Sequence, residues 1–151
     1  MVLALVALGG TRLMAQREKL SPEDYDFVYR KWPNVQKTST GVRYIVEKEG
    51  TGRVAQSGDE VSVFYTGTLL DGTKFDENWN AKSPFHFRLD RGEVIKGWDQ
   101  ILQQMHVGER RLVIVPAELA YGDRGQAPKI PRDAVLVFDM QLIKDVPPPA
   151  Q

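Results

Sequence analysis

Residues 92–105 read GEVIKGWDQILQQM, and their apolar side chains have the spacing of an amphipathic helix. Six of them recur at intervals that place them on one helical face, and these are Val94, Ile95, Trp98, Ile101, Leu102 and Met105. Two glycines, Gly92 and Gly97, stand in the front half of the segment. Glycine is unfavourable there unless the chain turns sharply or another group approaches the backbone. The segment therefore predicts a short helix whose Trp98 either fills a core or lines a site.

On both sides of this helix, apolar and polar residues alternate with the period of two that is typical of strands. The alternating stretches are residues 41–47, 60–69, 84–89, 110–116 and 134–144. Asp71-Gly72 follows the second stretch and is the usual signal for a tight turn that needs positive φ. One short helix among about five strands, without a βαβ rhythm, predicts an α+β fold. We expect a curved antiparallel β-sheet wrapped around that helix.

A second, shorter helix is predicted near the N-terminus. Ser21 offers a cap hydroxyl, Pro22 suits the first turn, and two acidic residues follow at the positive end of the helix dipole. Pro33 ends the helix. We interpret residues 16–40 as an N-terminal extension that ends in a linker at 38–41, residues 41–146 as the main domain, and residues 147–151 as an unordered tail.

Residues 1–15 carry an apolar run, Val2–Leu8, that is far too short to span a bilayer. It resembles the apolar region of a secretory signal, with Leu13-Met14-Ala15 as a cleavage site before Gln16. No basic residue precedes the run. We expect an exported protein, in the periplasm or a secretory compartment; the alternative is a strand or unordered end of a cytosolic protein.

The composition excludes several classes of function. Twenty basic residues balance twenty acidic ones, so no overall field favours nucleic acid or an anionic membrane. The chain has no cysteine, and its two histidines lack the spacing of metal ligands. Nucleotide-binding loops and nucleophile elbows are absent as well. We therefore expect no metal, no cofactor and no stable membrane insertion.

Aromatic residues supply the positive signal. Seven come from separate parts of the main domain, and these are Tyr65, Phe75, Phe85, Phe87, Trp98, Tyr121 and Phe138. Each one alone is explained by core packing. Tyr121 is the exception because it lies in a glycine-rich loop, where no core needs a large ring and where binding residues concentrate. The residues alone predict a protein that binds an apolar group in an aromatic cleft.

Eight ordered motifs resemble those of the FKBP-type peptidyl-prolyl isomerases, over residues 41–145. They are Val63-Phe64-Tyr65-Thr66-Gly67-Thr68-Leu69, Asp71-Gly72-Thr73-Lys74-Phe75-Asp76, Pro84-Phe85-His86-Phe87, Glu93-Val94-Ile95-Lys96-Gly97-Trp98, Met105-His106-Val107-Gly108-Glu109, Ala120-Tyr121-Gly122, Ile130-Pro131 and Leu136-Val137-Phe138-Asp139. The resemblance implies a half-barrel of strands around a helix at 98–105. It also implies a proline-binding pocket between helix and sheet, and acceleration of X-Pro bond rotation in folding proteins without any cofactor.

The resemblance also implies the residues of the site. Those with a catalytic role would be Tyr65, Asp76, Trp98, Tyr121 and Phe138, and those that bind substrate would be Phe75, Phe85, Val94, Ile95 and Ile130. Trp98 would form the floor, with Gly97 permitting the sharp turn into the helix. The Ile95 N–H and the Tyr121 hydroxyl would bond the peptide's carbonyl groups.

The chain departs from the family's pattern at Ala81, where a basic residue often partners the pocket aspartate. Asp76 is then either less neutralised or paired with Tyr121 and Lys82. This departure keeps open an alternative function, a catalytically weak binding or chaperone module. Proline-containing polypeptides are the expected partners and macrolides the expected inhibitors. Relatives with similar extensions suggest a dimer formed by the N-terminal helix.

Overall fold

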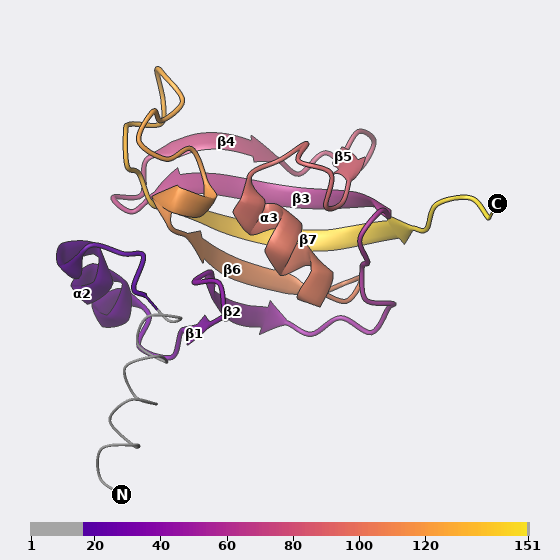
Figure 1. Ribbon diagram of the computed structural model, residues 1–151. Coiled ribbons are helices and arrows are strands. Elements are labelled where there is room, and N and C mark those ends of the chain that lie inside the picture. Colours follow the sequence, from indigo (N-terminus) through magenta and orange to yellow (C-terminus); the bar gives the residue numbers. More distant parts are fainter. Residues whose placement is uncertain (1–16, 151) are drawn as a thin grey trace, which may run out of the picture.

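The computed structural model describes residues 17–150, and it is an open antiparallel sheet with a short helix on one face (Figure 1). The order of the strands across the sheet is β1-β2-β6-β7-β3-β4, and β5 also pairs with β3. The elements of the sheet are β1 (Gln36–Lys37), β2 (Arg43–Lys48), β3 (Glu60–Leu69), β4 (Lys74–Asn78), β5 (Phe85–Arg88), β6 (Arg110–Val115) and β7 (Leu136–Val146). The expected α+β class, with a sheet wrapped around one short helix and a helical N-terminal extension, is confirmed.

The helix predicted from the apolar spacing is α3 (Lys96–Ile101), which continues as the 3₁₀ turn η1 (Leu102–Gln104). It begins two residues earlier than expected and ends one residue earlier. Its apolar face packs on the inner face of the sheet. The fully buried residues there include Ile101, Leu102, Met105, Leu136, Met140 and Leu142.

Gly97 is needed for close packing and not for the sharp turn expected of it. It lies inside α3, and a Cβ atom at this position would stand 2.5 Å from Cγ1 of Val115 on β6. Contacts that short do not occur between carbon atoms, so helix and sheet approach each other closely only because residue 97 is glycine. The positive φ belongs instead to Gly92, at +71°.

One end of the outer face of the sheet is covered by the N-terminal extension. Its helix α2 (Pro22–Lys31) begins as predicted, because Ser21 Oγ accepts a hydrogen bond of 3.1 Å from the Asp24 N–H. In β7 and the residue before it, side chains alternate between the two faces. Val135 and Val137 therefore point away from α3, and they form a separate buried cluster with Leu20 and Val28 of the extension.

Arg43 shows the effect of this covering. Alternation along β2 placed it on the polar face, yet only 1% of the side chain is exposed. Its guanidinium lies 2.6 Å from a Glu18 carboxylate oxygen and 3.3 Å from the Tyr29 hydroxyl, and it stacks on Tyr25 and Tyr29. Burial raises the pKa of Glu18, but the hydrogen bonds from Arg43 and from the Leu20 N–H, together with the nearby positive charges, lower it below its ordinary value. The extension thus adds both apolar packing and a partly buried ion pair.

Two local expectations were wrong. Residues 38–41 are not a linker; they form the turn of the β1–β2 hairpin, in which Gly41 has φ of +102°. Residues 74–78 were not expected to be a strand, yet they form β4 at the edge of the sheet, paired with β3. Lys, Asp, Glu and Asn are poor strand formers, so local preference gave no signal there. The turn at Gly72, with φ of +91°, was predicted correctly.

Some expectations concern parts of the chain that lie outside this description. The proposed leader, residues 1–15, is among the residues that the structure does not describe. Between residues 17 and 150, no helix is long and apolar enough to cross a membrane.

Candidate functional site

Trp98 forms the floor of an aromatic cluster on the helix side of the sheet. Its indole is 4% exposed, and four rings surround it with centroids 5.0 to 6.0 Å away. Three of these rings, those of Tyr65, Phe85 and Phe138, meet it edge to face at 76–80°, an arrangement that aromatic pairs favour. The fourth is Phe87. A rigid apolar floor results.

The walls come from four strands. Tyr65 lies on β3, Phe75 on β4, Phe85 on β5 and Phe138 on β7. Phe75 reaches the site by crossing over Gly67, since a Cβ on Gly67 would lie 2.6 Å from Cζ of Phe75. The glycine in this strand therefore allows the Phe75 ring to stand edge-on against Phe138, with ring centroids 5.8 Å apart.

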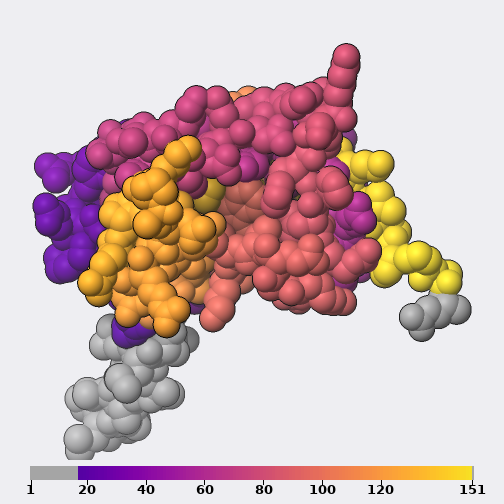
Figure 2. All heavy atoms as spheres, turned by 90° about the horizontal axis from the view of Figure 1, so that it is seen from above, coloured from indigo at the N-terminus to yellow at the C-terminus, as the bar shows by residue number. Residues whose placement is uncertain are grey.

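These side chains enclose a hollow of about 180 Å³. In Figure 2 the surface is hollowed between the orange segment that carries Tyr121 and the salmon segment that carries α3. Ligand pockets for drug-sized molecules measure roughly 300–1,000 Å³, so this hollow fits one ring and its immediate neighbours. Its lining residues are Tyr65, Phe75, Asp76, Phe85, Glu93, Val94, Ile95, Trp98, Tyr121 and Phe138.

The structure brings together nine of the ten site residues expected from the sequence. The tenth, Ile130, lines an adjoining hollow that shares Phe75, Asp76 and Tyr121 with the first. Glu93, which the resemblance implied as part of the pocket wall with Val94 and Ile95, lies at the rim of the hollow. Sequence reasoning missed the contact of Phe87 with the floor.

The polar edge of the hollow is built around Asp76. The Tyr65 hydroxyl donates a hydrogen bond of 2.6 Å to Asp76 Oδ2. Burial, followed by this bond and the charge of Asp76, raises the pKa of Tyr65, so the hydroxyl stays protonated. Burial and the same charge also raise the pKa of Tyr121, whose side chain is about two-fifths exposed at the mouth.

The expected partners of Asp76 were therefore wrong. Within residues 17–150, neither Tyr121 nor Lys82 bonds its carboxylate, and Tyr65 does so instead. Ala81 is exposed. The Asp76 carboxylate thus has a neutral hydrogen-bond donor as its partner.

The amide of Ile95 meets the geometric requirement for a ligand donor. Ile95 precedes the first turn of α3 in an extended conformation, with φ of −59° and ψ of 149°. Its carbonyl accepts from the helix, but no group within residues 17–150 accepts from its N–H. The first N–H groups of a helix lack internal partners, so this donor is available to a bound group.

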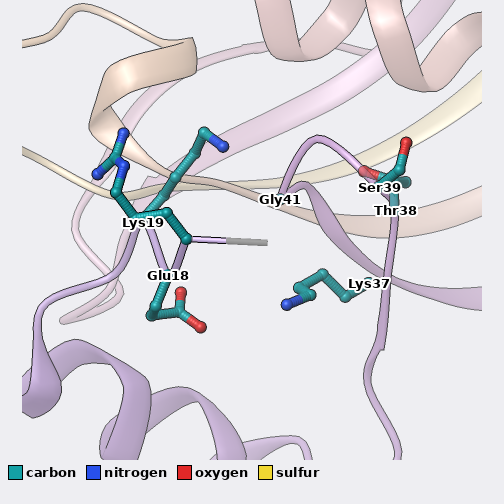
Figure 3. A pocket seen from close by; sticks show the side chains of 7 residues that line it. Glu18, Lys19, Lys37, Thr38, Ser39 and Gly41 are labelled. Carbon is teal, nitrogen blue, oxygen red and sulfur yellow. The ribbon is translucent and has the colours of Figure 1, made fainter. Parts of the chain in front are cut away.

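A second hollow, also of about 180 Å³, lies between residues 17–19 and residues 37–41 (Figure 3). Its wall is charged, but most of the charge is neutralised. Arg17 and Lys19 lie 2.6 and 3.8 Å from Glu118, and Glu18 pairs with Arg43. No aromatic side chain lines it. We therefore place the functional site at the aromatic hollow. Among residues 17–150, no cluster of three potential metal ligands occurs.

Comparison with known proteins gives a consistent result. The sequence model of the family "FKBP-type peptidyl-prolyl cis-trans isomerase" matches residues 51–143. Peptidyl-prolyl cis-trans isomerase FKBP2 of Mus musculus is 50% identical over 90 residues, covering 60% of this chain and 64% of the relative. Peptidyl-prolyl cis-trans isomerase FKBP4 of Rattus norvegicus is 48% identical over 109 residues, covering 72% of this chain and 24% of the relative.

A solved structure extends the likeness beyond the matched range. The crystal structure of a peptidyl-prolyl cis-trans isomerase from Pseudomonas syringae superposes with a TM-score of 0.73 at 32% identity, covering 85% of this chain and 93% of that one. In the two sequence comparisons, by contrast, the aligned region spans only about a quarter of FKBP4 and about two thirds of FKBP2. Sequence, fold and the aromatic hollow agree, and the chain belongs to the FKBP-type peptidyl-prolyl cis-trans isomerase family.

Proposed function

We propose that this protein accelerates rotation about X-Pro peptide bonds by holding the prolyl ring in the aromatic hollow. One observation carries the proposal. Rings from β3, β4, β5, α3 and β7 converge on a hollow of about 180 Å³, and a few polar side chains, Asp76, Glu93 and Tyr121, complete its lining. That size and apolar lining suit a pyrrolidine ring stacked on Trp98.

The chemistry follows from the electronic structure of the amide. Rotation has a barrier of about 20 kcal/mol, because the planar ground state delocalises the nitrogen lone pair into the carbonyl group. That delocalisation separates charge, and water stabilises it. The twisted transition state has lost the resonance and is less polar. An apolar hollow therefore favours it relative to the ground state, and a reduction of about 5 kcal/mol gives almost four powers of ten in rate.

The polar groups would orient the bound peptide. In this proposal the free N–H of Ile95 and the hydroxyl of Tyr121 donate to carbonyl groups of the peptide on either side of the ring. Asp76 would act at the edge of the hollow, held there by Tyr65. These roles need no nucleophile, because no covalent bond forms or breaks in the reaction.

The test is the cis-to-trans relaxation of a proline-containing peptide, followed without a coupled protease. Wild-type protein should accelerate it, and Phe138→Ala should lower kcat/KM by about tenfold or more, since the mutation opens one wall of the hollow. Phe64→Ala is the matched control, because Phe64 packs on Trp79 and does not line the hollow. Background rates with folded wild-type protein, or equal losses in the two variants, would contradict the proposal.

The same assay distinguishes the alternative, a binding or chaperone module with little turnover. Ala81 left that function open in the sequence, but the bond from Tyr65 already gives Asp76 a partner. Suppression of aggregation of an unfolded client without rate enhancement would favour the alternative. An FKBP-binding macrolide should compete with the peptide for the hollow in either case.

We further propose that the protein works on folding polypeptides after export, on the basis of the apolar run at residues 2–8. Fractionation of cells that express the full chain tests this location.

A dimer formed through the N-terminal helix is a separate proposal, and light scattering decides it. The apolar side of α2 is already buried against its own sheet, so Tyr25 and its exposed neighbours would have to form the interface.

A further inference from the structure

The loop that carries Tyr121 has little packing of its own. Between η2 (Ala117–Leu119) and β7, residues 121–134 are mostly exposed, and Ile130 is the only one of them that is buried. Four backbone hydrogen bonds shape this segment, from the Gly122 N–H to the Ala117 carbonyl, from the Gly125 N–H to the Tyr121 carbonyl, and between Gln126 and Ile130 in both directions. Few buried contacts and exposed hydrogen bonds are the properties of segments that open locally. The position of Tyr121 therefore depends on what holds the two ends of the loop.

Both ends of the loop contact the N-terminal extension. At the first end, Arg17 lies 2.6 Å and Lys19 3.8 Å from the carboxylate of Glu118 in η2. At the second end, Val135 is buried against Leu20 and Val28. The Asp133 N–H then bonds the Gly122 carbonyl at 2.9 Å and ties the two ends together. In Figures 1 and 2 the indigo α2 segment lies beside the orange segment.

The extension and the loop also share the walls of one hollow. From the extension it is lined by Lys19, Ser21 and Asp24, and from the two ends of the loop by Ala117, Glu118, Gly122, Asp123, Asp133 and Val135. Exposed ion pairs such as Arg17–Glu118 stabilise little, so most of the support comes from the buried side chains. Val28 is fully buried and Leu20 nearly so.

We propose that residues 17–35 are a positioning element for the Tyr121 loop, so that the mouth of the pocket depends on a segment outside the family's matched range. This inference rests on the proposed function for its effect on activity, but its structural part stands independently. None of these residues touches the hollow that would hold the substrate. They act through Glu118 and Val135, by fixing where the loop begins and ends.

The test uses the full chain with Val28→Ala, and Val61→Ala as the matched control. Both side chains are fully buried and the chemical change is the same, but Val61 lies on β3 beside Asp145, away from the extension. Hydrogen exchange of amides 120–134 should speed up by about tenfold or more in Val28→Ala and less than threefold in Val61→Ala. The value of KM should rise several-fold in Val28→Ala with kcat nearly unchanged, because Tyr121 would bind ground and transition states alike.

Equal exchange and equal KM in the two variants would overturn the inference. Leu20→Ala is the second variant, because Leu20 belongs to the same buried cluster but lies outside α2 in the chain. If both extension variants unfold the whole domain, the segment is part of the folding core and not a positioning element. If wild-type protein has no isomerase activity, the proposed function fails, while the exchange measurement still decides whether the extension holds the loop.

Discussion

Replacement of Asp145 should change the pH dependence of stability in a way that the structure allows us to calculate. The Asp145 side chain on β7 is 0% exposed, and the neighbouring Asp59 side chain is 3% exposed. A single cation, Arg53, contacts both, at 2.5 Å from Asp145 and 3.1 Å from Asp59. Neither oxygen of Asp145 accepts a well-directed hydrogen bond from the described residues. Its buried charge is therefore poorly compensated.

Burial, with a further contribution from Asp59, raises the pKa of Asp145 from 3.8 to about 6. Below pH 4 the folded and unfolded chains both carry the proton. Between pH 4 and 6 the folded chain keeps it while the unfolded chain loses it, so the free energy of unfolding falls as pH rises through this window. Above pH 6 the loss is complete. A shift of this size corresponds to about 3 kcal/mol in total, of which about 2 kcal/mol separates pH 4.5 from pH 7.5.

Asp145→Asn places a neutral side chain of the same shape at this position and removes the titration. The difference in unfolding free energy between variant and wild type should therefore change by about 2 kcal/mol between pH 7.5 and pH 4.5, in favour of the wild type at the acidic end. Urea unfolding at constant ionic strength measures it, and Asp26→Asn, on the exposed side of α2, is the control. A difference that is constant with pH, or that changes in the opposite direction, would refute the reasoning.

Three further outcomes are expected. Gly97→Ala should lower the free energy of unfolding by about 1–3 kcal/mol, because the new Cβ meets Val115 at 2.5 Å. The double variant with Val115→Ala should regain part of that free energy, and urea unfolding measures both. Tyr65→Phe and Asp76→Asn should each reduce kcat/KM, and the double variant should lose no more than the worse single variant, since one bond of 2.6 Å joins them. Additive losses would show that they act separately. Trp98→Phe should change the free energy of unfolding by less than about 1.5 kcal/mol. The buried indole N–H of Trp98 has no partner among residues 17–150, so removing this unpaired donor offsets the packing that the smaller ring loses. Thermal unfolding measures the change.

Much of the fold could be predicted because its signals are local. Ser21 and Pro22 mark the start of α2 through groups within one helical turn of each other. The alternation of residues 60–69 identified β3, and Asp71-Gly72 identified the turn that follows. The aromatic residues of the site were also identified, through the ordered motifs that resemble the family.

Other features could not be predicted, because they depend on which surfaces meet. The sequence showed that Arg43 lies on one side of β2, but not that α2 covers that side and buries it. The edge strand β4 has no strand-forming residues to reveal it and exists because β3 offers it a partner. Asp59 and Asp145 are far apart in the chain, and no local pattern indicates that they share one buried cation.

By itself, the sequence determined the positions of helices, turns and most strands, the family, and the set of aromatic residues around Trp98. Propensities and periodicities act between neighbours a few residues apart, and such information is written directly in the chain. Only the tertiary structure decided that Tyr65 is the partner of Asp76, that Gly97 serves close packing against Val115, and that the extension supports the Tyr121 loop. Each of these depends on the distance between atoms of different elements, and that distance is fixed only when the helix, the extension and the strands have packed together.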